Sequence, residues 1–243
     1  MSNEIIKKDT GSVALFGDDL QKGFENMTQE DMALPFVRIL GQLSPQVTDG
    51  DAKYIDGAKP GMIYNTVTSE CFDGKKGIKV IPCYYKKDYP EWSDRGDGPG
   101  APVAVHLPNS PVIATGKRDG SKIRLPNGNY LEETASYYVL VETKAGGMAP
   151  ALITMKSTQL NVSKKWNSMM KTIQIPDGKG GMAIPPMHGV VYNLQSVLQK
   201  NDKGSWYGWS VAQDRIMGQA DKTLYLTAKD FNSSVAKGNV QTK

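Results

Sequence analysis

The sequence predicts a mainly β protein, an OB-like antiparallel barrel with one inserted helix and long glycine-rich loops. Short runs of β-branched and aromatic residues recur along the chain between turn signals of Gly, Pro, Asn and Asp. The segment of residues 158–173 instead has apolar residues at helical spacing. Glycine-rich stretches at residues 94–100 and 177–181 indicate flexible loops. One helix among many short strands is typical of an OB-like barrel.

The expected strands alternate with turns from residue 62 onward. In chain order they are residues 62–68, 78–85, 136–143, 149–155, 188–198 and 206–213, with further short candidates within residues 101–133. Residues 72–77 form a turn signal before the second strand, and Pro82 marks an edge or a bulge in it. We expect three parts: a loosely ordered arm (1–30), an OB-like domain (31–228), whose binding candidates are described below, and a polar basic tail (229–243).

The expected helix has one apolar stripe and one basic side. Ser157 or Thr158 can cap its start, and the stripe consists of Val162, Trp166, Met169, Met170 and Ile173. This stripe turns Trp166 into the core and leaves Lys164, Lys165 and Lys171 outward. Lys156 precedes the helix, and no carboxylate lies between Lys156 and Lys171.

The charge of the chain is unevenly spread. Among 243 residues the net charge is +4, but from Pro150 onward there are 12 Lys and Arg against 5 Asp and Glu. Three of the four tryptophans also lie in this basic part. The asymmetry points to an anionic partner, although a solvated basic face gives the same count.

Several chemistries lack the residues that they need. The two histidines and two cysteines have no metal-ligand spacing, and no phosphate-binding glycine loop or nucleophile elbow is present. We therefore expect no cofactor, no metal and no catalysis, although distant carboxylates can still converge into an unrecognised enzyme site. No apolar run reaches the length of a membrane span, and the N-terminal residues lack a signal-peptide core, so a cytoplasmic location is expected.

Aromatic residues on the strands supply candidate stacking faces for unpaired bases. Alternation along residues 206–211 places Trp209 in the core and Trp206 outside, where Gly208 would leave room for a flat base. The alternative for Trp206 is an ordinary surface or loop-covered tryptophan. Alternation along the strand after Gly77 places the cations Lys79 and Lys87 and the aromatic residues Tyr85 and Tyr89 together on one face. The alternative is a half-exposed edge strand. The candidate DNA-binding residues are Lys79, Tyr85, Lys87, Tyr89, Trp92, Lys156, Lys164, Lys165, Lys171 and Trp206.

Several segments resemble a group of tailed-phage proteins associated with phage DNA replication and single-stranded DNA binding. The resemblance is carried by residues 31–40, 60–67, 77–84 with Glu91 and Trp92, 156–160 and 165–168. It implies an OB-type barrel and a replication role in the host cytoplasm. One departure is the absence of a carboxylate after Asp230, because proteins that bind single-stranded DNA commonly end in an acidic tail.

The leading hypothesis is a non-catalytic, sequence-tolerant single-stranded DNA-binding protein that acts in phage DNA replication or recombination. Lysines would contact phosphates while aromatic rings stack on bases. Phage replication or recombination proteins are candidate partners, no membrane is involved, and homo-oligomerisation is left open. The alternative is a phage protein that binds a host protein through its aromatic and basic patch.

Overall fold

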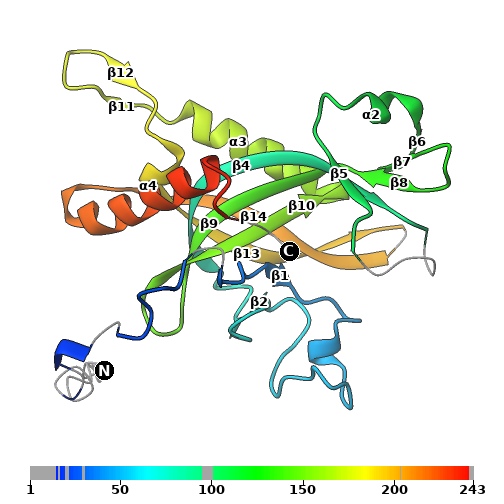
Figure 1. Ribbon diagram of the computed structural model, residues 1–243, viewed down its shortest axis with the longest axis horizontal. Helices are drawn as coiled ribbons and strands as arrows, with labels where there is room; N and C mark the ends of the chain where they lie inside the picture. The colour runs from blue at the N-terminus through cyan, green and yellow to red at the C-terminus, as the bar shows by residue number, and fades with distance from the viewer. Residues whose placement is uncertain are drawn as a thin grey trace.

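Five long antiparallel strands form a strongly curled sheet, a half-barrel, at the centre of the protein (Figure 1). This computed structural model describes residues 15, 17–19, 22–28, 31–94, 101–202 and 204–240. The strands are β4 (Ile78–Trp92), β9 (Thr134–Glu142), β10 (Met148–Lys156), β13 (Val190–Asn201) and β14 (Gly204–Ile216), in the spatial order β10-β9-β4-β13-β14. The prediction of a mainly β, barrel-like protein is confirmed at this level.

Smaller elements extend the half-barrel at three places. β1 (Val37–Ile39), β2 (Ile63–Asn65) and β3 (Cys71–Phe72) form a small sheet. An insert between β4 and β9 contains β5 (Ala104–His106), α2 (Pro111–Thr115), β6 (Lys117–Asp119), β7 (Lys122–Arg124) and β8 (Tyr130–Glu132). A short hairpin of β11 (Ile175–Pro176) and β12 (Met182–Ala183) follows the first long helix. 3₁₀ turns occupy Gly17–Asp19, Pro45–Val47, Ser157–Gln159, Met187–Gly189 and Gln219–Asp221.

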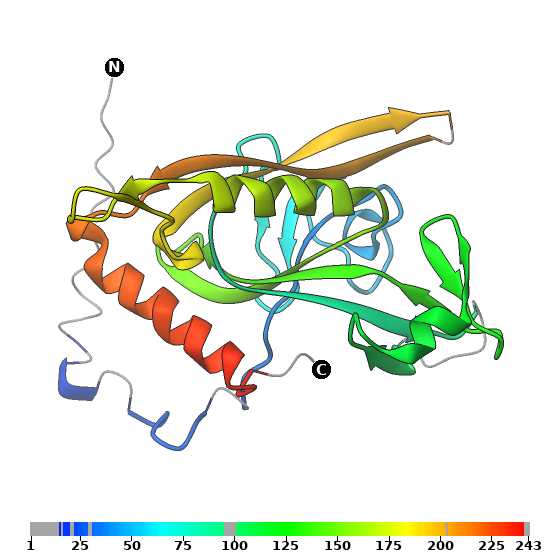
Figure 2. The same cartoon turned by 90° about the horizontal axis from the view of Figure 1, so that it is seen from above.

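Two long helices cover different sides of the curled sheet (Figure 2). α3 (Leu160–Thr172) packs with β1 and β2 on the inner face, in a core that includes Val80, Tyr137 and Tyr192. α4 (Lys222–Ala236) packs on the outer face, against Ile81 and Leu140. The sheet is therefore apolar on both faces, which explains why its central strands are buried along most of their length.

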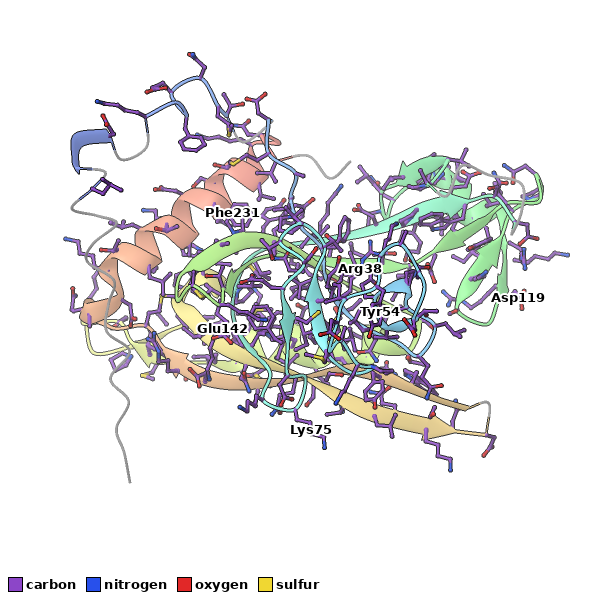
Figure 3. All side chains as sticks on the ribbon, turned by 90° about the horizontal axis from the view of Figure 1, so that it is seen from below. Arg38, Tyr54, Lys75, Asp119, Glu142 and Phe231 are labelled. Atoms are coloured by element: carbon purple, nitrogen blue, oxygen red, sulfur yellow. The ribbon has the colours of Figure 1, made fainter. Side chains whose placement is uncertain are left out.

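The expected boundary between domain and tail at residue 229 falls inside α4. Ala228, Phe231 and Val235 are buried, and Phe231 lies on the side of the helix that faces the sheet (Figure 3). Their spacing of three and four residues gives α4 one apolar stripe. Most of the expected N-terminal arm, residues 95–100 of the glycine-rich loop and the last three residues lie outside the described part of the chain.

A β-bulge in β4 changes which side chains share a face. The register against β9 shifts between Pro82 and Tyr84, so that Ile81, Cys83 and Tyr84 face α4. Tyr85 then returns to the inner face, opposite Tyr137. A bulge inserts one residue and reverses the alternation beyond it. The expectation that Lys79 and Tyr85 share a face is therefore wrong, although Pro82 had marked the bulge.

Close approach of two loops to β13 requires a glycine at position 74. A Cβ on Gly74 would lie 1.9 Å from the carbonyl oxygen of Gly61 and 2.7 Å from Cβ of Ser196. The backbone N–H of Ser196 also donates to the Gly74 carbonyl at 2.8 Å. This contact holds the loops around the small sheet against the half-barrel.

We predict that Gly74→Ala destabilises the protein by about 1–3 kcal/mol, because backbone must move to admit the methyl group. Urea unfolding of the variant measures the change. Gly147→Ala is the matched control, since a Cβ there meets nothing closer than 3.9 Å. Equal stabilities of the two variants would contradict the close approach.

The buried carboxylate of Glu91 joins the insert to the end of β4. It accepts hydrogen bonds from Nδ2 of Asn129 (2.6 Å), Nδ2 of Asn127 (3.0 Å) and Nε2 of His106 (2.7 Å). The hydrogen bond from Asn129 is the largest cause that lowers the pKa of Glu91 below its ordinary value of 4.5, followed by the one from His106. These bonds favour the ionised carboxylate in the folded protein.

A lowered folded-state pKa means that Glu91 contributes stability above its unfolded pKa, and that this contribution is lost as pH falls through the folded pKa. We predict that the free energy of unfolding of the wild type falls more steeply than that of Glu91→Gln on acidification below about pH 5. Urea unfolding across an acid pH series measures both slopes. Parallel pH profiles would show that Glu91 does not couple folding to protonation.

Candidate nucleic-acid interface

A stack of three aromatic rings fixes α3 on the inner face of the sheet. Trp166 is fully buried, with its ring centroid 4.3 Å from that of Tyr137 in a stacked arrangement and 5.6 Å from that of Tyr192 edge-on. Tyr137 and Tyr192 come from β9 and β13, on either side of β4. The predicted inward direction of Trp166 is confirmed.

Hydrogen bonds also fix the orientation of α3 on the sheet. The hydroxyl of Tyr137 donates to Oδ1 of Asn167 at 2.8 Å and lies 2.8 Å from Oγ of Ser163. Burial raises the pKa of Tyr137 well above its usual range, so the hydroxyl keeps its proton. At the other end of the helix, Oε1 of Gln159 accepts from the backbone N–H of Trp209 at 2.7 Å. The rotation of α3 about its axis is thereby set.

This rotation leaves three lysines of α3 in solvent. Lys164, Lys165 and Lys171 are exposed, while Ser163, Trp166 and Met170 on the same helix are buried. In the described part of the chain, no ion pair joins any of the three lysines to a carboxylate. They are free to neutralise the charge of an anionic partner.

The other lysine candidates are already paired with carboxylates. Lys79 lies 2.5 Å from Asp214, Lys87 lies 3.1 Å from Glu133, and Lys156 lies 2.7 Å from Glu132. The hydrogen bond to Glu133 is the main cause that raises the pKa of Lys87. These pairs are separated by 24 to 135 positions in sequence, so local charge counting could not reveal them. Because their positive charges are compensated by carboxylates, these three lysines are weaker candidates for phosphate contacts than the sequence indicated.

Tyr85 and Lys171 meet at a pocket of about 630 Å³. It is lined by Tyr85, Asn167, Met170, Lys171, Ile184, Pro185, Pro186, Met187, His188 and Asn232. It lies beside the stretch of β4 between the residues that pair with β13 and those that pair with β5. There the 3₁₀ turn Met187–Gly189 contacts β4, and residues 184–186 before it line the same pocket.

Trp206 lies at a separate hollow on the β13–β14 hairpin. This hollow, of about 340 Å³, is lined by Trp206, Tyr207, Ser205, Leu198 and residues 39–43. Trp206 is only half-buried, but the space beside Gly208 is not open to a base. A Cβ on Gly208 would meet the side-chain amides of Gln159 at 2.3 Å and Gln199 at 2.8 Å. The expected room beside Trp206 is therefore filled.

The two aromatic candidates at the end of β4 are packed within the insert. Tyr89 is 9% exposed and belongs to the small core around Leu131. Trp92 is half-buried, and its indole nitrogen has no accessible surface. Tyr89 supports the insert, Trp92 is paired in register with Tyr130 of β8, and neither ring joins Tyr85 at the pocket.

Three residues that line the pocket are not among the candidates predicted from the sequence: Asn167, His188 and Asn232. Asn232 lies on α4, in what was expected to be a tail, and its Nδ2 donates to the carbonyl of Cys83 at 2.5 Å. The bulge that Pro82 indicated could have suggested this contact, because a bulge leaves a backbone group of its strand unpaired. Burial, and secondarily Lys229, lowers the pKa of His188, so its ring is neutral at pH 7.

The chain belongs to the family of Pam3 phage gp34-like proteins, whose family model matches residues 7–241. The expected kinship with phage proteins is thereby confirmed. Searches found no similar curated protein and no similar solved structure. Among the described residues, no helix is long and apolar enough to cross a membrane, and no cluster of three His, Cys, Asp or Glu could hold a metal.

We predict that Trp166→Ala lowers the free energy of unfolding by about 3–5 kcal/mol, because it empties the centre of the inner core. Chemical unfolding measures the loss. Trp206→Ala is the matched control and should cost much less, since Trp206 is half-exposed. Normal melting of Trp166→Ala would show that the aromatic stack does not hold α3.

Proposed function

We propose that this phage protein binds single-stranded DNA without strong sequence preference and without catalysis, in phage DNA replication or recombination. The observation that carries the proposal is the set of Lys164, Lys165 and Lys171, held outward by a buried aromatic stack and unpaired within the described residues. Cations fixed on a rigid element neutralise phosphates without reading bases.

The order of the strands supports an OB-type barrel. α3 falls between the third and fourth of the five long strands, counted along the chain, which agrees with a barrel that has one inserted helix. OB-folds bind oligonucleotides on the face of their second and third strands and through the loops after their first and fourth strands. Here the corresponding connections are the β5–β8 insert and the β13–β14 hairpin, which project to the same end of the molecule (Figures 1 and 2).

A second candidate function is binding of a host protein through the hollow beside Trp206. Leu43 is 95% exposed and Leu198 is 61% exposed at this hollow. Exposed apolar residues grouped around a half-buried tryptophan are typical of a protein-binding surface. Retention on single-stranded DNA resin that decreases with salt favours the first function over this one.

We predict that replacing Lys164, Lys165 and Lys171 together by Gln weakens binding to oligonucleotides of every base composition about equally. The slope of log affinity against log salt should shrink by about two units, since each phosphate contact on a single strand contributes about 0.7. Fluorescence titrations with dT and mixed-sequence oligomers at several salt concentrations measure both effects.

The matched control replaces Lys79, Lys87 and Lys156 by Gln, which changes net charge by the same amount. Because these lysines are paired with carboxylates, the control should change the salt slope less. Equal slopes in the two triple variants would show that only net charge matters. Unchanged affinity and slope in the α3 variant would show that this helix is not the binding surface.

A further inference from the structure

The pocket beside β4 combines four distant parts of the chain into one lining. β4 contributes Tyr85, α3 contributes Asn167 and Lys171, the segment around the 3₁₀ turn Met187–Gly189 contributes His188, and α4 contributes Asn232. Its volume of about 630 Å³ is in the range of small-molecule sites. The prolines and methionines of the lining add apolar surface to these polar groups.

The two asparagine side chains of the pocket can make different hydrogen bonds with a ligand, one as donor and one as acceptor. Oδ1 of Asn167 accepts from the hydroxyl of Tyr137, and within the described residues its NH₂ group has no acceptor, so it can donate to a ligand. Nδ2 of Asn232 donates to the carbonyl of Cys83, and within the same residues its Oδ1 has no donor, so it can accept from a ligand. Both amides are held by buried structure, which presents one donor and one acceptor in fixed places.

The remaining groups fit a flat ligand with one anionic substituent. Tyr85 offers an aromatic ring, and its own position is fixed by Tyr137, with the ring centroids 5.1 Å apart. Lys171 is an exposed cation at the rim. His188 adds a neutral polar group. A nucleobase carries donors and acceptors on one edge and stacks on aromatic rings, while its phosphate requires a cation.

We propose that this pocket binds one unstacked nucleotide, with the base against Tyr85 and between the two asparagine amides, and the phosphate beside Lys171. The inference rests on the proposed function, because Lys171 lines the pocket and is also one of the three unpaired lysines of α3. It adds a position with base preference to an otherwise sequence-tolerant surface. The nucleotide belongs to a bound strand or is a free mononucleotide.

The test uses the full chain, calorimetric titration with each of the four deoxynucleoside monophosphates, and titration with a dT oligomer and mixed-sequence oligomers. Ile184→Glu places a negative charge in the pocket lining at a side chain that is 52% exposed. Met182→Glu is the matched control, because it makes the same change two residues away and outside the lining. Thermal melting verifies that both variants fold.

We expect at least one mononucleotide to bind, and Ile184→Glu to weaken that binding about tenfold or more while Met182→Glu leaves it unchanged. Lys171→Gln should weaken binding of the mononucleotide but not of the corresponding nucleoside, which lacks the phosphate. This second variant keeps the proposal testable if Ile184→Glu folds poorly.

Other outcomes separate the two proposals. Oligomer binding without mononucleotide binding, unaffected by Ile184→Glu, overturns the pocket and leaves single-stranded DNA binding intact. Mononucleotide binding without oligomer binding supports the pocket as a site for free nucleotides and overturns the proposed function. Absence of both kinds of binding overturns both proposals.

Discussion

The contact of Trp166 with Tyr137 and Tyr192 is the interaction on which the rest of the structure depends. It joins α3 to two strands that flank β4, and so holds the helix inside the curl of the sheet. An indole and two phenol rings bury a large apolar area at one point, and aromatic pairs add about 0.5–1.5 kcal/mol each beyond that burial. The hydroxyl of Tyr137 is satisfied by Ser163 and Asn167, so the packing carries no penalty at that group.

The same contact decides which side chains face solvent. With Trp166 inward, the unpaired lysines of α3 must point outward, and Asn167 must lie at the boundary between core and pocket. On β4 the bulge has a comparable role, because it brings Tyr85 to the inner face. It also lets the backbone carbonyl of Cys83 accept a hydrogen bond from Asn232 of α4. A cation, an aromatic ring and two amides thus meet at one place, although they come from segments separated by up to about 150 positions.

The parts of this arrangement that depend on local periodicity could be predicted from the sequence. The apolar stripe of α3 gave the direction of Trp166, and alternation gave the burial of Trp209. Alternation failed beyond Pro82, because one inserted residue reverses every later assignment. Two contacts depend on the tertiary fold, which no local pattern encodes. They are the ion pair of Lys79 with Asp214 and the hydrogen bond from Asn232 to the backbone carbonyl of Cys83. Likewise, the apolar stripe of Ala228, Phe231 and Val235 packs against the outer face of the sheet, and that face forms only in the folded protein.

Lysine acetylation read by mass spectrometry, with and without a saturating dT oligomer, tests most directly whether the face of α3 is the binding surface. We expect Lys164, Lys165 and Lys171 to lose reactivity when the oligomer is bound. Lys75 is exposed in the turn before β4 and is not part of α3 (Figure 3), so it should react equally in both states. Unchanged reactivity of the α3 lysines, at an oligomer concentration that saturates the protein, would show that single-stranded DNA does not bind on α3.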